Sequence, residues 1–165
     1  MSVPSHVLPA ACLDALTTRT ATVATAESLT AGLVSATLAG VAGASTALRG
    51  GVVAYASDIK VSMLGVDAHL VATDGVVSAA VAEQMAAGVR ERMSTDWGIA
   101  TTGVAGPDPQ DGHLPGEVYV AVAGPDGLVD VRKLELTGDR QEIRAATVDA
   151  VLALLLSHLG GDGSG

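Results

Sequence analysis

Three side chains that could share a proton relay lie between Gly43 and Lys60, in the stretch GASTALRGGVVAYASDIK. Ser45 stands in a turn of small residues, Tyr55 follows after an apolar run typical of a strand, and Lys60 comes shortly after that. A hydroxyl nucleophile, a phenol and an amine can move a proton without a histidine. The same spacing also suits a structural turn serine, a half-buried strand tyrosine and a solvated lysine, so both interpretations stay open.

Further candidates lie in loops at the ends of expected strands. Ligands of open α/β sheets favour the region outside the carboxyl ends of the strands. The loop candidates are Glu27 and Ser28 in TAES, Gly43 beside Ser45 in GAST, and Thr102 and Gly103 in TGVAGP. For Glu27 and Ser28, helix N-capping is an alternative role.

Arg140 follows Gly138 and Asp139 at the expected start of the last helix. Its guanidinium offers a fork of donors that suits a pair of phosphate oxygens. The alternative is a solvated arginine in the first helical turn.

The elements that must position these residues alternate between helical and extended patterns. We expect helices at residues 6–18, 29–38, 57–64 and 77–93, and a last helix from Asp139, where Asp139 and Glu142 resemble a capping box. We expect strands at 21–25, 50–56, 97–101, 117–123 and 128–136, the last two joined as a hairpin across GPDG. This pattern predicts an α/β layered fold with a mixed sheet. The whole chain, 1–165, is read as one domain with its core at about 13–159 and a disordered tail at 160–165.

Composition limits the class of protein. The 165 residues are 48% hydrophobic but include no Phe, one Trp and two Tyr, which predicts an aliphatic core. The net charge of −9 argues against nucleic acid or an anionic membrane as a main partner, because phosphate binding needs a basic surface.

Cysteine and histidine usage bears on compartment and metals. The single Cys12 fits a reducing cytosol, and the N-terminus has neither the charge nor the apolar segment of a signal peptide. We therefore expect a cytoplasmic protein. The four histidines are scattered and have no metal-ligand spacing, so neither a metal nor another cofactor is expected.

Five short motifs together resemble the C-terminal domain of the CinA family, the competence- and damage-inducible proteins. They follow one another along nearly the whole chain: TAESLTAG (25–32), GGVVAY (50–55), MLGV (63–66), TTGVAGP (101–107) and LTGDR (136–140). The family includes stand-alone nicotinamide mononucleotide amidohydrolases. The resemblance implies a three-layer α/β/α sandwich with a mixed, mostly parallel sheet and one C-terminal hairpin, and we expect a homo-oligomer.

The resemblance also implies a role for six residues. Ser45, Tyr55 and Lys60 would be catalytic, and Thr102, Gly103 and Arg140 would bind a small nucleotide substrate. Glu27, Ser28 and Gly43 are weaker candidates beside it. In this interpretation Ser45 attacks the carboxamide of nicotinamide mononucleotide, and Lys60 and Tyr55 manage the protons without a metal.

The chain departs from the family pattern at three places. In TAESLTAG, Leu29 and Ala31 replace the usual Cys and Gly, and Ala44 replaces the first serine of the usual GSS. The loop before Pro115 lacks the usual lysine, leaving His113 as the nearby group that can become positive. Two alternatives therefore stay open: a catalytically silent nucleotide-binding or assembly module, and an amidohydrolase acting on another small carboxamide.

Overall fold

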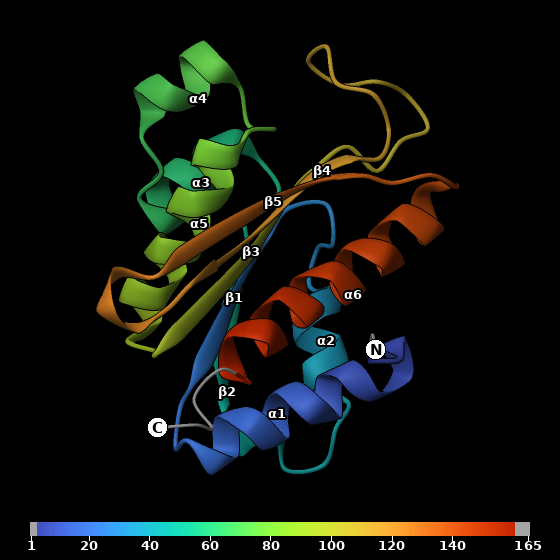
Figure 1. Cartoon of the computed structure of the whole chain (residues 1–165). Helices are drawn as coiled ribbons and strands as arrows, with labels where there is room; N and C mark the ends of the chain where they lie inside the picture. Colours follow the sequence, from blue (N-terminus) through green and yellow to red (C-terminus); the bar gives the residue numbers. More distant parts are fainter. Residues whose placement is uncertain (1–2, 161–165) are drawn as a thin grey trace.

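The computed structural model describes residues 3–160, which form three layers around one five-stranded sheet (Figure 1). The strand order is β2-β1-β3-β4-β5. The strands are β1 (Val23–Glu27), β2 (Leu48–Val53), β3 (Trp97–Gly103), β4 (Glu117–Ala123) and β5 (Val129–Glu135). β1 pairs in parallel with β2 and β3, and β4 runs antiparallel to both β3 and β5. All strands except β4 therefore point the same way, which confirms the mixed, mostly parallel sheet.

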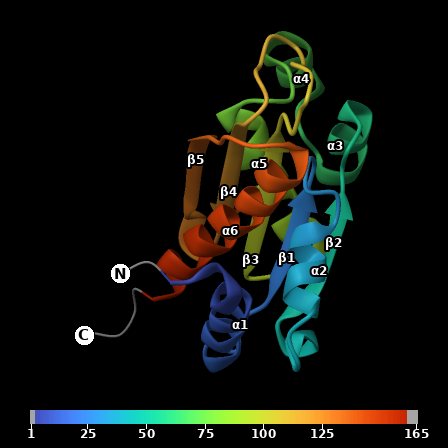
Figure 2. The same ribbon diagram turned by 90° about the vertical axis from the view of Figure 1, so that its right-hand side faces the viewer.

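Helices cover both faces of the sheet (Figures 1 and 2). One face carries α1 (Leu8–Thr18), α2 (Leu33–Ala39) and α6 (Arg140–Leu159), and the other carries α3 (Ser57–Leu64), α4 (Ala68–Asp74) and α5 (Ala79–Met93). Short 3-10 turns lie at Ser5–Val7, Ala44–Thr46 and Pro125–Gly127. The α/β/α sandwich is thus confirmed, and none of the described helices is both long and apolar enough to cross a membrane.

The core is aliphatic and divided by the sheet. The larger cluster packs α1 and α6 against the sheet around Leu16, Leu152 and Leu155, all fully buried. The second cluster packs α5 against the opposite face and is built mostly of Ala and Val. Small side chains allow close approach of helix to sheet, so a core without Phe can still exclude water.

Local sequence signals place most of the elements correctly. The β4–β5 hairpin forms across Pro125–Gly127, and Asp139 with Glu142 makes the full capping box expected at the start of α6. The last turn of α3 ends at Gly65 with φ +71°, the left-handed conformation that glycine adopts without strain.

The sequence patterns were wrong in two places. Helix α4 was not expected, because its short segment buries no residue and so carries no apolar stripe. Helix α2 begins at Leu33 and not at residue 29, because residues 28–32 turn back on themselves with Ala31 and Gly32 at positive φ. Gly160 caps α6, and the rest of the expected tail, 161–165, lies outside the described residues.

One glycine fixes the position of α3, the helix that carries Lys60. A Cβ built at Gly88 of α5 would lie 1.9 Å from the Leu64 carbonyl oxygen, so only glycine lets the two helices approach this closely. The packing of α3 against α5 holds the Lys60 side chain above the carboxyl ends of the strands.

Candidate active site

The carboxyl ends of β1, β2 and β3 meet at one edge of the sheet, where a small cavity of about 60 Å³ lies. In the sheet β1 lies between β2 and β3: the chain leaving β1 next forms β2 on one side of it and later forms β3 on the other side. This change of direction is the place where open α/β sheets bind ligands. The cavity is lined by Ser28, Leu29, Tyr55, Ser57, Lys60, Val76, Val77, Thr102, Gly103 and Gln110.

Lys60 is the most unusual residue of this cavity, because its side chain is only 1% exposed. Its Nζ donates to Ser28 Oγ at 3.0 Å, to the Ala54 carbonyl at 2.7 Å and to the Tyr55 carbonyl at 3.3 Å. No carboxylate is among these partners. Burial therefore lowers the pKa of Lys60 from 10.5 to about 8, because desolvation penalises the ammonium form.

Ser28 presents its hydroxyl to this amine from the turn after β1. The side chain is buried, and the backbone N–H donates to the Thr101 carbonyl of β3 at 3.0 Å. The turn is closed by a hydrogen bond from Ala31 N–H to the Ser28 carbonyl. A buried hydroxyl within hydrogen-bond distance of an amine with a lowered pKa is the arrangement of an activated nucleophile and its base.

Glu27 lies next to Ser28 in the sequence but points elsewhere. Its carboxylate accepts hydrogen bonds from Val34 N–H at 2.7 Å and Ser35 N–H at 3.1 Å. These are free N–H groups of the first turn of α2, so Glu27 acts as a cap from outside the helix. The capping alternative therefore describes Glu27 but not Ser28, whose hydroxyl faces Lys60.

Tyr55 and Arg140 form the rim of the cavity. Tyr55 is 57% exposed, and its hydroxyl accepts a hydrogen bond from Arg140 Nη2 at 2.9 Å. Arg140 Nη1 donates to the Gly106 carbonyl at 2.7 Å. The guanidinium thus links the segment after β2 to the loop after β3, and it remains near the surface. Tyr55 is exposed and not half-buried, and its backbone carbonyl is the part that contacts Lys60.

Thr102 and Gly103 shape the wall formed by β3. The Thr102 hydroxyl is buried and donates to the Val76 carbonyl at 2.7 Å, which attaches the segment before α5 to the strand. A Cβ at Gly103 would lie 2.7 Å from the Glu117 carbonyl oxygen, so glycine is required for β3 to approach β4 there. Both residues lie in the cavity wall as the sequence suggested, and the Thr102 hydroxyl is already used by the protein.

Ser45 and Gly43 lie at the other end of the sheet. Both precede β2, whereas Tyr55 and Lys60 follow it, and β2 spans about 20 Å at roughly 3.3 Å per residue. Ser45 is exposed, and Gly43 has φ +85° at the start of the Ala44–Thr46 turn. The expectation that Ser45 shares a proton relay with Lys60 is therefore wrong, and backbone N–H groups near Ser45 cannot serve an oxyanion at Lys60.

His113 occupies the loop that lacks the usual lysine. Its Nδ1 pairs with Glu117 Oε2, and Lys133 Nζ lies 3.2 Å from the other oxygen of the same carboxylate. Both side chains are thus engaged with Glu117, while Gln110 from the same loop reaches the cavity wall. Within residues 3–160, no group of three or more His, Cys, Asp or Glu side chains is arranged to hold a metal ion.

Cys12 is a packing residue. Its side chain is fully buried and its Sγ donates to the Leu152 carbonyl at 3.3 Å. Burial raises the pKa of the thiol to about 12, so the thiolate is not available for chemistry.

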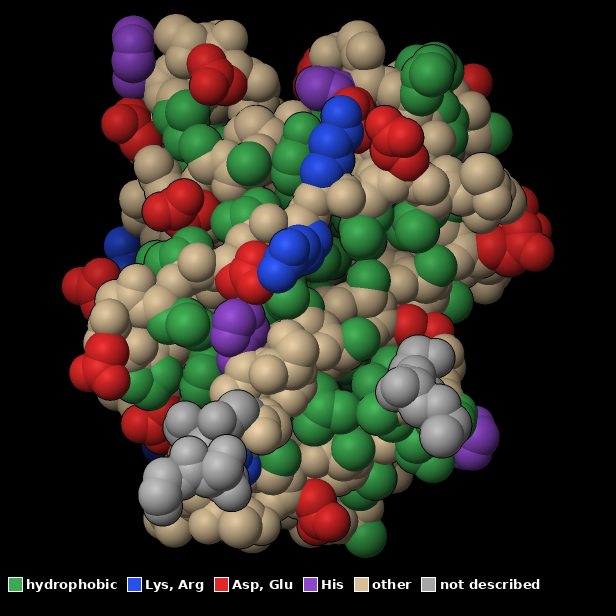
Figure 3. Space-filling model, viewed as in Figure 1, with side chains coloured by type: hydrophobic (Ala, Val, Ile, Leu, Met, Phe, Trp, Pro, Cys, Tyr) green, Lys and Arg blue, Asp and Glu red, His purple; other side chains and the backbone are tan. Residues whose placement is uncertain are grey.

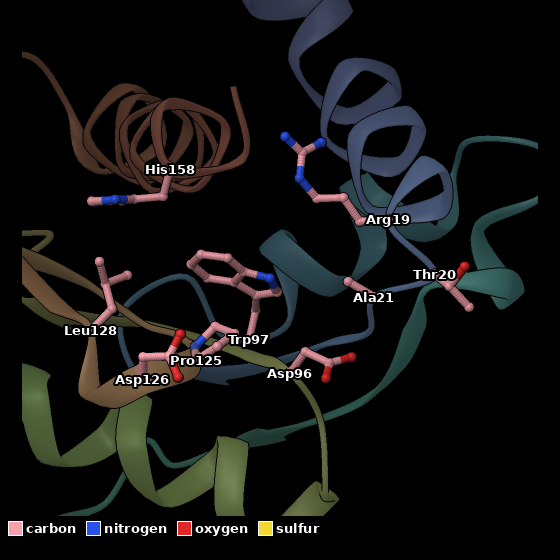
Figure 4. A pocket seen from close by; sticks show the side chains of 9 residues that line it. All are labelled: Arg19, Thr20, Ala21, Asp96, Trp97, Pro125, Asp126, Leu128 and His158. Carbon is pink, nitrogen blue, oxygen red and sulfur yellow. The ribbon is translucent and has the colours of Figure 1, made fainter. Parts of the chain in front are cut away.

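A wider pocket of about 500 Å³ lies at the amino ends of β1 and β3 (Figure 4). It is lined by Arg19, Thr20, Ala21, Asp96, Trp97, Pro125, Asp126, Leu128 and His158. His158 Nε2 pairs with Asp130 at 2.9 Å, and the Asp96 carboxylate accepts from Thr22 N–H at 2.8 Å. The ionic groups of this pocket thus stabilise the protein itself, and no nucleophile faces a base there among the described residues.

Comparisons with known proteins agree on one family. The model of the CinA C-terminal domain matches residues 6–159. A CinA-like protein of Frankia casuarinae is 49% identical over 149 residues, and a putative competence-damage inducible protein of Halothermothrix orenii is 40% identical over 145 residues. These matches cover 90% and 87% of this chain but only 34% and 35% of the relatives, so the chain spans about one third of their length.

Solved structures share the fold over their full length. The competence/damage inducible protein CihA of Agrobacterium tumefaciens superimposes with a TM-score of 0.91 at 33% identity, covering 97% of this chain and 98% of that one. The competence damage-inducible protein A of Klebsiella pneumoniae gives a TM-score of 0.92 at 30% identity, covering 98% of this chain and 100% of that one.

Proposed function

The chain belongs to the CinA C-terminal domain family, and we propose that it is an amidohydrolase that converts nicotinamide mononucleotide to nicotinate mononucleotide and ammonia. The observation that carries the proposal is the 3.0 Å hydrogen bond between Lys60 Nζ and Ser28 Oγ inside a small cavity. Ser28 takes the nucleophilic role that the sequence assigned to Ser45.

The reaction begins with Lys60 in its neutral form. With a pKa of about 8, roughly a tenth of the amine is neutral at pH 7, against less than a thousandth for an ordinary lysine. The neutral Nζ takes the proton of the Ser28 hydroxyl while Oγ bonds to the carboxamide carbon. The protonated Nζ then donates to the amide nitrogen, the C–N bond breaks and ammonia leaves.

The second half of the reaction uses the same residues. Water attacks the ester between Ser28 and the acyl group, and Lys60 again takes and returns the proton. Tyr55 and Arg140 lie outside this proton path, since the Tyr55 hydroxyl accepts from Arg140 and not from Lys60. No metal is needed for any step.

The dimensions of the site suit a nucleotide that enters by its amide end. A cavity of about 60 Å³ has room for a carboxamide, whereas whole ligands of drug size occupy about 300 Å³ or more. The rest of the substrate would therefore lie outside, across Tyr55 and toward Arg140. Arg140, on the rim, would supply charge-assisted hydrogen bonds to the phosphate.

An ammonia-release assay on a panel of amides tests the proposal. Nicotinamide mononucleotide should be turned over, free nicotinamide should be a very poor substrate, and exhaustive chelation should leave the rate unchanged. Absence of ammonia from every amide, with measurable nucleotide binding by calorimetry, would favour a nucleotide-binding module. Loss of turnover on chelation, restored by a divalent ion, would replace serine attack by metal-activated water.

A further inference from the structure

Arg144, in the second turn of α6, contacts the loop that carries Ser28. Its Nε donates to the Leu29 carbonyl at 2.9 Å, and its Nη2 donates to the Thr30 carbonyl at 3.0 Å. These are the two carbonyl groups that directly follow Ser28. The guanidinium is partly buried, and its hydrogen bonds among the described residues go to backbone oxygens of this loop.

The direction of these carbonyls fixes the direction of an N–H group. In a planar trans peptide, the C=O and the N–H point in opposite directions. The Leu29 carbonyl shares its peptide with Thr30 N–H, so a Leu29 carbonyl held toward α6 turns Thr30 N–H away from α6. Arg144 thus sets the orientation of the peptide next to the Ser28 side chain.

The N–H groups of this turn divide into two pairs. Ser28 N–H donates to the Thr101 carbonyl, and Ala31 N–H donates to the Ser28 carbonyl, each at 3.0 Å. Leu29 N–H and Thr30 N–H have no acceptor among residues 3–160, although both residues are buried. Backbone donors without a partner in buried residues are rare in proteins, and this turn keeps two of them free directly after Ser28.

We propose that Arg144 is a positioning residue that holds the Leu29–Thr30 peptide so that its free N–H group, that of Thr30, stabilises the oxyanion formed when Ser28 attacks an amide. The inference rests on the proposed amidohydrolase function. Backbone N–H groups near the nucleophile commonly form such an oxyanion hole, and their worth depends on being fixed beforehand. A guanidinium presents its donors in one fixed plane, whereas the tetrahedral ammonium of a lysine on a flexible stem does not reproduce that geometry.

Two arginines one helical turn apart therefore have separate tasks. Arg140 is exposed and reaches Tyr55 and Gly106 at the rim, whereas the hydrogen bonds of Arg144 within residues 3–160 go to the nucleophile loop. Loss of Arg140 should act on substrate binding and loss of Arg144 on the transition state.

The kinetic test compares Arg144→Met, Arg144→Lys and Arg140→Met with the parent protein on nicotinamide mononucleotide. Arg144→Met should lower kcat about 10- to 100-fold with little change in KM, somewhat less than the loss of an oxyanion donor itself. Arg144→Lys should recover only part of kcat, and Arg140→Met should raise KM instead. The matched control is Arg19→Met, since Arg19 donates to the Ala15 carbonyl of its own helix at the other end of the sheet and should change neither constant.

Hydrogen exchange supplies a readout that does not depend on turnover. Amides of residues 28–32 should exchange faster in Arg144→Met than in the parent, whereas Arg19→Met should leave this segment unchanged. An unchanged kcat in Arg144→Met would overturn the proposal, whether or not hydrogen exchange becomes faster. In that case any loss of kcat/KM would come from a higher KM alone, and Arg144 would act on substrate binding. If the parent itself hydrolyses no amide, the proposed function fails, and the role of Arg144 in catalysis fails with it.

Discussion

The two ends of the sheet differ in what they offer to a ligand. The amino end has a wide pocket of about 500 Å³ around Trp97, and Ser45 also lies at this end. At the carboxyl ends of β1, β2 and β3 lies a cavity of only about 60 Å³, but it holds Lys60 and the Ser28 hydroxyl. Of these two cavities, the smaller one thus contains the reactive pair.

Burial explains the difference. The ionic groups of the wide pocket include Asp96 and His158, whose hydrogen bonds stabilise local structure. Lys60 is removed from water without a carboxylate partner, and this desolvation makes its amine available as a base. The face seen in Figure 3 carries scattered acidic side chains and only a few Lys and Arg, in line with the net charge of −9.

The largest expected effect separates the two serines. Ser28→Ala should reduce ammonia release by about 10⁴-fold or more, because the nucleophile itself is lost. Ser45→Ala, the matched control at the other end of β2, should keep the parent rate. Both variants should melt at nearly the parent temperature, and the rates are compared at equal concentration of folded protein. Full activity of Ser28→Ala would show that a group other than the Ser28 hydroxyl is the nucleophile.

Removal of the amine should have the next largest effect. Lys60→Met keeps an unbranched side chain in the buried space but cannot accept a proton, so kcat should fall by about 10²- to 10⁴-fold. In the parent, kcat/KM should rise with pH and level off above a pKa of about 8, as the neutral amine becomes the main form. A profile that is flat between pH 6 and 9 would contradict the role of Lys60 as the base.

The same pKa predicts how stability depends on pH. Between pH 8 and 10.5 the folded protein has released the Lys60 proton while the unfolded chain still holds it, so the unfolded state binds more protons and stability rises with pH. A shift from 10.5 to about 8 corresponds to about 3 kcal/mol across this window. Denaturant unfolding of the parent and of Lys60→Met at pH 7.5 and 10.5 measures this difference. If the free energy of unfolding changes equally with pH in both proteins, the pKa of Lys60 is not lowered in the folded protein.

Arg140 tests the rim of the reactive end. Arg140→Ala should raise KM for nicotinamide mononucleotide by roughly 2–3 kcal/mol of lost charge-assisted hydrogen bonding, with a smaller effect on kcat. His158→Gln, in the wide pocket, should leave KM unchanged. Equal turnover of nicotinamide and its mononucleotide by the parent would remove the phosphate role given to Arg140.

The smallest predicted effect concerns strain in the nucleophile turn. Ala31 has φ +47°, a left-handed conformation that disfavours any residue with a Cβ. Ala31→Gly should therefore relieve backbone strain and raise the stability by about 1 kcal/mol, partly offset by the greater entropy of the unfolded chain. Thermal unfolding measures the change, and a clear loss of stability would show that the Ala31 methyl group is needed for packing.

Sequence patterns predicted most of the architecture because each element carries its own local signal. The capping box at Asp139 and the glycine at Gly65 act within a few residues, and the hairpin forms between neighbouring strands. The start of α2 was misplaced because the turn at 28–32 depends on contacts with Glu27 and Arg144. Helix α4 buries too little to leave a pattern.

The sequence, through its resemblance to the CinA family, predicted Lys60 and Tyr55 as parts of one site with the TAES and TGVAGP loops, and it placed Ser45 there as well. Only the tertiary structure decided which serine faces the amine. Ser45 is nearer to Lys60 along the chain, but a residue before a strand and a residue after it lie at opposite ends of that strand. Parallel pairing of β1 with β2 brings Ser28 to the end where Lys60 lies, and α6 brings Arg144 to the same loop from more than a hundred residues away.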